Sequence, residues 1–227
     1  NMVLQREKPI VICGTAKDKG SVTVEHNGKS TTVDVADNGT WKAELPEMKA
    51  GRPYTLKVSG QNSVELKNVM IGEVWVCSGQ SNMEWNVKNS VNGDAEIAAA
   101  NYPDIRIFHV KKDRSPTGTK EELVGEWKVC TPESIPNFSA VGYFFGRKLN
   151  KDLNVPVGLI NSSWGGTMIE PWISRKGFES DPKYASIVSS LDKAKSGEDN
   201  KPEAPKVDEK LVNWQKDIET FYKKEID

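Results

Sequence analysis

Ser81 is the residue of this sequence whose surroundings best suit nucleophilic chemistry. The preceding run, Glu73–Cys77, is almost continuously apolar and predicts a strand that is covered on both faces. Gly79 then permits a tight turn, and a helix is predicted to begin at Ser81, at the carboxyl end of the sheet. The helix N-terminus would offer N–H groups to a developing oxyanion. The alternative is that Ser81 only caps the helix, and the Gly-x-Ser-x-Gly pattern is incomplete because Met83 replaces its second glycine.

A second turn of small residues follows another predicted buried strand, Val155–Ile160. In this turn Gly165 and Gly166 let the backbone approach a ligand closely and present N–H groups, which suits a second oxyanion donor. A plain tight turn is the alternative interpretation. Trp85 and Trp164 lie near the two segments and could stack on a sugar ring, although burial in the core would explain either one equally well.

The elements that must position these residues alternate between strand and helix from about Asn68 onward. The pattern predicts buried strands and helices in turn, at Glu73–Cys77, Asp94–Asn101, Ile105–Val110, Ser139–Leu153 and Val155–Ile160. Such alternation is typical of a parallel α/β sheet. The helix predicted at Ser139–Leu153 has apolar residues at helical spacing, namely Val141, Phe144, Phe145 and Leu149, and Ser139 is its expected N-cap.

The first part of the chain has a different pattern, one of short strands separated by turns. Val22, Val24 and His26 alternate with polar residues and lead into Asn27-Gly28, a strong signal for a two-residue hairpin. Further strands and turns follow at short intervals, which favours an antiparallel sandwich. We therefore predict a β-sandwich-like domain over residues 1–67 and an α/β domain over residues 68–227.

The composition excludes several classes of function. The formal net charge is -1, with 31 basic and 32 acidic residues, so no electrostatic signal points to nucleic acid. No apolar run approaches the length of about 20 residues that a membrane-spanning helix needs. The three cysteines, Cys13, Cys77 and Cys130, are far apart and none forms a Cys-x-x-Cys pair, which argues against metal or redox chemistry. We expect all three to be structural.

Four blocks of the sequence resemble the sialate O-acetylesterase family, which belongs to the SGNH hydrolases. They are the segments Asn1–Arg6, Gly79–Met83, Phe138–Phe145 and Ser163–Trp172. Acetylxylan esterases share the Gly-Gln-Ser-Asn-Met block. The resemblance implies a flavodoxin-like, three-layer α/β domain behind an N-terminal β-domain, and removal of O-acetyl groups from a sugar such as 9-O-acetylated sialic acid. Acetylated xylan, another acetylated glycan, or a catalytically silent carbohydrate-binding scaffold remain alternatives.

The resemblance also implies roles for individual residues. Ser81 would be the nucleophile, and its N–H together with that of Gly166, or of Gly165, would form part of the oxyanion hole. Gln80 and Asn82 flank the nucleophile and, with Trp85 and Trp164, are the expected substrate contacts. The resemblance implies no metal and no other cofactor. It favours a secreted or periplasmic protein, although no signal peptide is visible.

Two elements of the family pattern are missing. The family places its catalytic histidine in an Asp-x-x-His motif, whereas this chain has only His26 and His109, neither of which follows an aspartate at that spacing. The family's Asn block is echoed only by Gly197–Asn200, in a polar stretch with no strand before it. We therefore expect an incomplete α/β domain, either a truncation, a proteolytic piece or one of two chains of a cleaved enzyme, with the histidine supplied by the missing C-terminal segment. A helix at Asp181–Lys195, a linker at Lys195–Pro205 and an amphipathic helix at Asp208–Ile226 are also predicted.

Overall fold

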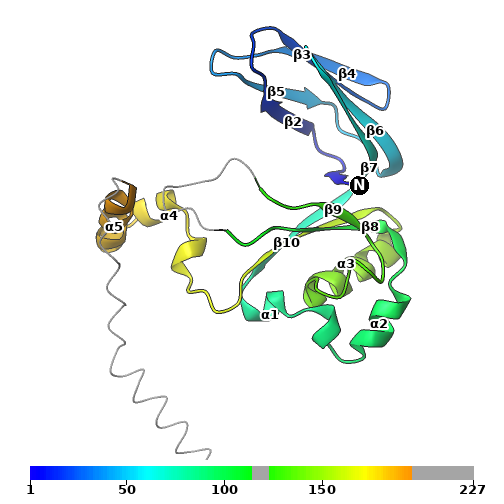
Figure 1. Cartoon of the computed structure of the whole chain (residues 1–227), viewed down its shortest axis with the longest axis vertical. Helices are drawn as coiled ribbons and strands as arrows, with labels where there is room; N and C mark the ends of the chain where they lie inside the picture. Colours follow the sequence, from blue (N-terminus) through cyan, green and yellow to red (C-terminus); the bar gives the residue numbers. More distant parts are fainter. Residues whose placement is uncertain (114–122, 196–227) are drawn as a thin grey trace, which may run out of the picture. The chain divides into compact units, whose positions relative to one another are not determined.

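The computed structural model describes residues 1–113 and 123–195 (Figure 1). The described residues fall into two compact units, one formed by residues 1–113 and 123–171 and the other by residues 172–195. The predicted linker, the predicted helix at Asp208–Ile226 and Asn200 lie outside the described residues. The chain is a mixed α/β protein, as the sequence predicts, and it has a large mixed sheet and a small antiparallel sheet.

The N-terminal strands form two antiparallel layers. One layer is the four-strand run β4-β3-β6-β7 of the large sheet, and the other is the pair β2-β5. The bounds are β2 Ile10–Thr15, β3 Ser21–His26, β4 Lys29–Asp34, β5 Thr40–Leu45, β6 Gly51–Ser59 and β7 Ser63–Gly79. The hairpin predicted at Asn27-Gly28 is confirmed, because both residues have positive φ, 47° and 72°, and join the paired strands β3 and β4.

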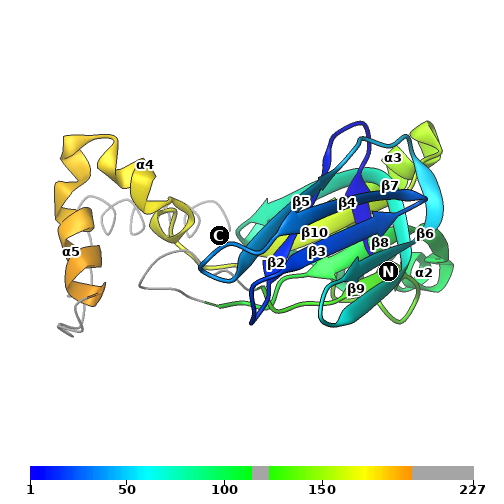
Figure 2. The same cartoon turned by 90° about the horizontal axis from the view of Figure 1, so that it is seen from above.

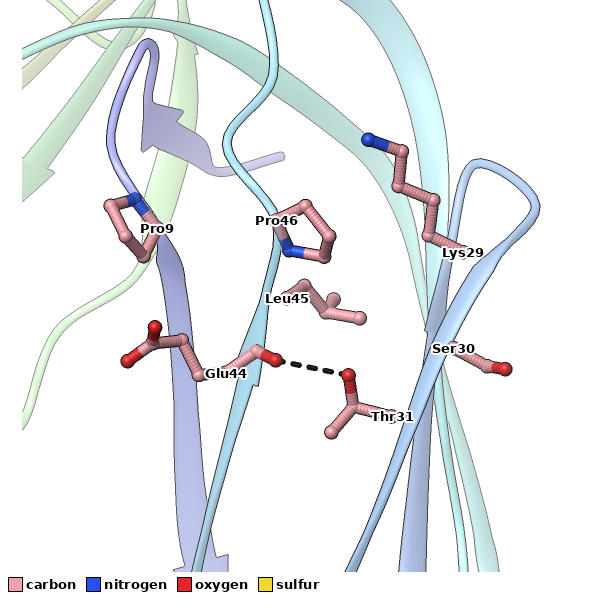
Figure 3. Close-up of a pocket in the computed structure, with 7 residues that line it drawn as sticks. All are labelled: Pro9, Lys29, Ser30, Thr31, Glu44, Leu45 and Pro46. Atoms are coloured by element: carbon pink, nitrogen blue, oxygen red, sulfur yellow. Dashed lines mark hydrogen bonds between the residues drawn. The ribbon is translucent and has the colours of Figure 1, made fainter.

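The inward residues of the two layers share one apolar core. Val22 and Val24 of β3, Leu56 of β6 and Leu45 of β5 are all buried in it. At one edge the layers are linked directly by the hydroxyl of Thr31, which donates to the Glu44 carbonyl oxygen over 2.9 Å (Figure 3). An open groove beside this link is lined by Pro9, Lys29, Ser30, Thr31, Glu44, Leu45 and Pro46.

His26 is buried within this core and gives the fold a pH dependence. Its side chain is 1% exposed, and its Nδ1 lies 3.2 Å from the Thr55 carbonyl oxygen, while its Nε2 has no hydrogen-bond partner among the described residues. Desolvation lowers the pKa of His26 below its ordinary value of 6.5. Below pH 6.5 the unfolded chain therefore binds a proton that the folded chain does not, and the free energy of unfolding falls.

We expect the free energy of unfolding to drop by up to about 1.4 kcal/mol per pH unit between pH 6.5 and the lowered pKa of His26. Urea unfolding at pH 7.5 and pH 5.5 measures this loss. A His26→Gln variant should lose less stability than the wild type between the two pH values, and an equal loss in both proteins would contradict the assignment to His26.

Strand β7 connects the N-terminal layers to the parallel part of the sheet (Figures 1 and 2). Its first half pairs antiparallel with β6, and Met70, Ile71 and Gly72 then pair in parallel with β1 (Val3–Gln5). Its last residues, 73–79, pair in parallel with β10. The division predicted between residues 67 and 68 thus falls inside a continuous strand, beside Asn68, whose φ is 56°. As a boundary between two independently folding domains it stays a prediction.

The C-terminal part of the large sheet has the order β7-β10-β8-β9. The bounds are β8 Tyr102–His109, β9 Trp127–Cys130 and β10 Val157–Ser163. The three predicted parallel strands are confirmed, with β10 between β7 and β8, and β9 adds an antiparallel edge strand that the sequence analysis missed. Because β7 and β10 are parallel neighbours, the segments that follow them emerge at the same edge of the sheet.

One face of this sheet is covered by helices α2 (Gly93–Ala99) and α3 (Ala140–Leu153) (Figure 1). The predicted N-cap is confirmed, since the Ser139 hydroxyl accepts the Gly142 N–H over 3.1 Å. The prediction that Val141, Phe144, Phe145 and Leu149 form the buried face of α3 is wrong in part. Val141 and Phe145 are 49% and 39% exposed, whereas Tyr143 is fully buried. The glycines of α3 set this orientation because they allow close contact with the sheet: a Cβ on Gly142 would lie 3.0 Å from the Cys77 sulfur.

The second unit is helical where it is described. It contains α4 (Arg175–Glu179) and α5 (Ala185–Lys195), and the side chain of Phe178 is buried in it. Helix α5 confirms the helix predicted near Asp181–Lys195, while α4 was not predicted. Arg175 pairs with Glu179 within α4 at 2.7 Å and joins α4 to α5 through an ion pair with Asp192 at 2.6 Å.

Candidate active site

Ser81 lies directly after β7 and begins α1 (Ser81–Glu84). Gly79 has a φ of 148°, a backbone conformation that residues with a side chain rarely adopt, and so makes the turn that the sequence predicts. The predicted helix is, however, only 4 residues long, and the side chain of its N-cap, Gln80, makes no capping hydrogen bond. A single turn carries little macrodipole. Stabilisation of an oxyanion here must therefore come from individual N–H groups.

The surface around Ser81 is open to solvent. Ser81 lies in a depression of about 520 Å³ lined by Gly79, Gln80, Ser81, Asn82, Met83 and Val141. Its hydroxyl lies 3.3 Å from the Gln80 side-chain oxygen, the acceptor of its hydrogen bond. The side chain is thus accessible to an ester, and the depression is built from the predicted nucleophile segment and one residue of α3.

The Gly165–Gly166 turn lies beside Ser81. Strand β10 pairs Ser163 with Gly79, and the Trp164 N–H donates to the Gly79 carbonyl oxygen over 2.9 Å. A Cβ on Gly165 would lie 3.6 Å from the Ser81 hydroxyl oxygen, which is ordinary contact distance, so the turn packs against the nucleophile. Gly166 has a φ of 75°, and a Cβ there would contact nothing within 4 Å. The two segments singled out in the sequence therefore meet in space.

Two side chains tie the segments together. The Gln80 side-chain nitrogen donates to the Thr167 carbonyl oxygen, and the Glu84 carboxylate accepts the Gly165 N–H. The Gly165 N–H is thereby occupied, whereas the Gly166 N–H has no hydrogen-bond partner in residues 1–113 and 123–195. The sequence did not decide between Gly165 and Gly166 as the second oxyanion donor. In the part of the chain that the structure describes, the Gly166 N–H is the one free to donate to an oxyanion.

The remaining predicted substrate contacts surround this point. Asn82 is exposed in the depression beside Ser81. Trp85 is 56% exposed, and its indole N–H donates to the Asn89 carbonyl oxygen over 3.1 Å. Trp164 is partly buried, with the Lys112 ammonium 5.5 Å from its ring centroid. Neither tryptophan is a fully buried core residue, so both rings retain surface that a ligand could contact.

Glu84 and Lys112 form the charged part of the site. They make an ion pair, and hydrogen bonds from Lys112 and the Gly165 N–H lower the pKa of Glu84 below its ordinary value of 4.5. Glu84 is therefore ionised at neutral pH. The sequence analysis did not select Lys112. The available signal was its position just beyond β8, because residues at the carboxyl ends of neighbouring parallel strands come together.

The two histidines lie in different surroundings. His26 is buried in the N-terminal core. His109 is the last residue of β8, where it pairs with Asn161 and has its ring centroid 6.4 Å from that of Phe138. Partial desolvation lowers the pKa of His109, while Glu84 raises it. Neither histidine makes a hydrogen bond to Ser81 in the described part of the chain.

No group of three or more His, Cys, Asp or Glu side chains is placed to hold a metal ion in the described ranges. Cys77 and Cys130 are buried free thiols, which agrees with a structural role, whereas Cys13 is exposed. Burial raises the pKa of Cys130 to about 12, so its thiol stays protonated at neutral pH. None of the helices described is long and apolar enough to cross a membrane.

The chain is similar to carbohydrate esterases in sequence and in structure. The family described as carbohydrate esterase, sialic acid-specific acetylesterase matches residues 71–204. Sialate O-acetylesterases from Pongo abelii and Rattus norvegicus are 36% and 38% identical to this chain, over 82% and 77% of its length. A crystal structure of a carbohydrate acetylesterase from Xanthomonas citri is 39% identical and superposes over 77% of the chain with a TM-score of 0.75.

The matches cover only part of each relative. The chain spans 40% of the Pongo abelii protein, 36% of the rat protein and 40% of the Xanthomonas citri structure. The matched region includes both segments that meet at Ser81. The chain belongs to the sialic acid-specific acetylesterase family of carbohydrate esterases.

Proposed function

We propose that this chain carries the nucleophile and the oxyanion donors of a serine esterase that removes O-acetyl groups from a sugar, with 9-O-acetylated sialic acid as the substrate. The observation that carries the proposal is the meeting of Ser81 with the Gly165–Gly166 turn in an open depression. The substrate is suggested by the names of the relatives. Within this proposal the protein acts in a secreted or periplasmic location.

In the proposed reaction the Ser81 hydroxyl oxygen attacks the acetyl carbonyl carbon and loses its proton to a base. The N–H groups of Ser81 and Gly166 bind the carbonyl oxygen as it becomes negatively charged. The base returns the proton to the departing sugar oxygen, which leaves as a hydroxyl, and water then hydrolyses the acetyl ester on Ser81 to release acetate. Gln80, Asn82, Trp85 and Trp164 are the proposed sugar contacts. Gln80 also helps to hold the nucleophile turn, because its amide bonds Thr167.

The base is the group that the chain does not supply in the proposed mechanism. Of the two histidines, His26 lies in the N-terminal core, and His109 makes no hydrogen bond to Ser81 among the described residues. A serine hydroxyl without a base is a weak nucleophile. We therefore assign the base to a histidine on a further segment of the enzyme, supplied as a separate chain or as additional sequence.

The test is acetate release from 9-O-acetylated sialic acid by the chain combined with the C-terminal part of a relative. Ser81→Ala should lower the rate by about 10³-fold or more, because it removes the attacking atom. Ser78→Ala, a change at an exposed serine on the same strand, should leave the rate unchanged. Faster release from acetylated xylan would change the assigned sugar, and binding of the sugar without turnover would favour a silent scaffold.

The chain alone provides a second measurement. We expect no acetate release from the 227 residues by themselves, because the base is missing. Turnover by the chain alone that is lost in Ser81→Ala would confirm the nucleophile and refute the missing base. His109→Gln would then show whether His109 acts as the base.

A further inference from the structure

Glu84, the last residue of α1, binds two groups from other segments of the chain. One carboxylate oxygen accepts the Gly165 N–H, and the other pairs with the Lys112 ammonium. Lys112 in turn lies over the ring of Trp164, the residue that precedes Gly165. Three segments that follow three neighbouring strands, β7, β8 and β10, are thus joined through one carboxylate.

This arrangement bears on the position of the oxyanion donors. A Cβ on Gly165 would lie 2.8 Å from the Glu84 carboxylate oxygen and 3.5 Å from the Ser81 Cα, so the turn is in close contact with α1. Since Glu84 occupies the Gly165 N–H, the next N–H along the turn, that of Gly166, is the one left to bind an oxyanion. The Gly166 N–H belongs to the peptide that joins Gly165 to Gly166. Its direction therefore depends on where Glu84 holds Gly165.

We propose that Glu84 is a positioning residue that, held by Lys112, fixes the Gly165–Gly166 turn against Ser81 and so directs the Gly166 N–H at the oxyanion. The proposal deepens the proposed function and, for its catalytic consequence, rests on it. Glu84 does not touch the reacting atoms. Its effect is geometric, and small displacements of a catalytic group are costly in rate.

The charge of Glu84 suits this role. Its lowered pKa keeps the carboxylate ionised across the neutral range, and a hydrogen bond to an ionised acceptor is about twice as strong as one between neutral groups. The side chains of Glu84 and Lys112 are 31% and 39% exposed, so the ion pair by itself adds little stability. Loss of the carboxylate should therefore alter the turn without unfolding the protein.

The first test measures the turn directly and needs no turnover. In nitrogen-15-labelled full chain at pH 7.5, where His109 is neutral, Glu84→Gln should shift the Gly165 and Gly166 amide signals. It should also speed hydrogen exchange at Gly165 about tenfold or more, because a charge-assisted bond is lost. Glu126→Gln is the matched control, since Glu126 also pairs with a lysine, Lys128, over 3.8 Å, and both side chains are more than half exposed.

The second test measures catalysis in the chain combined with the C-terminal part of a relative. Glu84→Gln should lower kcat about tenfold and change KM less than twofold, while Glu126→Gln should change neither. Lys112→Gln should give a smaller loss of kcat in the same direction, and the double variant should be no worse than Glu84→Gln alone. An effect confined to KM would assign Glu84 to substrate binding and overturn the proposal.

The two tests separate the possible failures. If the wild-type enzyme shows no turnover, the proposed function fails, yet the amide signals still decide whether Glu84 holds the turn. If the Gly165 and Gly166 amides are the same in Glu84→Gln and wild type, the positioning role is overturned whatever the activity. Restored amide signals in Glu84→Asp with Lys112 retained would support the carboxylate as the group responsible.

Discussion

Replacement of Gly72 by alanine is expected to lower the free energy of unfolding by about 3 kcal/mol or more. Gly72 is buried where β7 leaves its pairing with β1 and begins its pairing with β10. A Cβ at this position would lie 2.0 Å from the Pro156 carbonyl oxygen and 2.6 Å from its carbonyl carbon. These are backbone atoms, and the same oxygen accepts the Glu73 N–H over 2.9 Å, so neither strand can move without losing a hydrogen bond.

Urea unfolding of Gly72→Ala, followed by circular dichroism, measures the loss as a shift of the midpoint at constant slope. Gly60→Ala is the matched control, because a Cβ on Gly60 would lie 3.5 Å from its nearest neighbours, which is ordinary contact. We expect Gly60→Ala to change stability by no more than about 1 kcal/mol in either direction. Equal stability of the two variants would mean that the strands are not in contact at Gly72.

The second large effect is expected at Tyr143, the largest fully buried side chain among residues 1–113 and 123–195. Its ring packs in the core under the parallel sheet, with the ring of Tyr102 centred 6.2 Å away, and its hydroxyl donates to Glu96 of α2 over 3.4 Å. Burial raises the pKa of this phenol, so it remains a donor at any pH near neutral. Tyr143→Ala should lower the free energy of unfolding by about 3–5 kcal/mol through the lost burial and the cavity that remains.

Tyr143→Phe separates the ring from the hydroxyl. Phenylalanine keeps the buried area and gives up one long hydrogen bond, so its expected cost is only about 1 kcal/mol. Both variants are measured by urea unfolding at the same pH. A cost for Tyr143→Phe equal to that of Tyr143→Ala would show that the link between α3 and α2, rather than core packing, dominates at this site.

The local chemistry of the sequence determined much of the fold. Asn27-Gly28 can take the two positive φ angles of a tight hairpin, and alternation placed Val22 and Val24 in the core. Continuous apolar runs predicted the three parallel strands. The expected cover on both faces of Glu73–Cys77 is wrong, because Trp75 and Val76 are 44% and 66% exposed. Short-range patterns suffice for such features, since turns, caps and strand faces depend on neighbouring residues.

The buried face of α3 was decided only by tertiary packing. Hydrophobic spacing selected Val141 and Phe145, yet both are exposed, and the helix turns its glycines and Tyr143 to the sheet. Close approach of backbones outweighs the burial of two larger side chains, and periodicity alone does not measure it. The same holds for β9, a short strand whose place at the sheet edge depends on pairing with β8.

For the site, the sequence by itself identified the serine segment and the glycine turn, because both are local patterns at the ends of buried strands. Only the tertiary structure decided which glycine N–H is available. The partner of the Gly165 N–H is Glu84, which lies on the segment that follows β7, whereas Gly165 follows β10. Lys112, the ion-pair partner of Glu84, lies on the segment that follows β8. Contacts between residues far apart in the sequence leave no local pattern, so the geometry around Ser81 became visible only once β7, β8 and β10 were placed side by side.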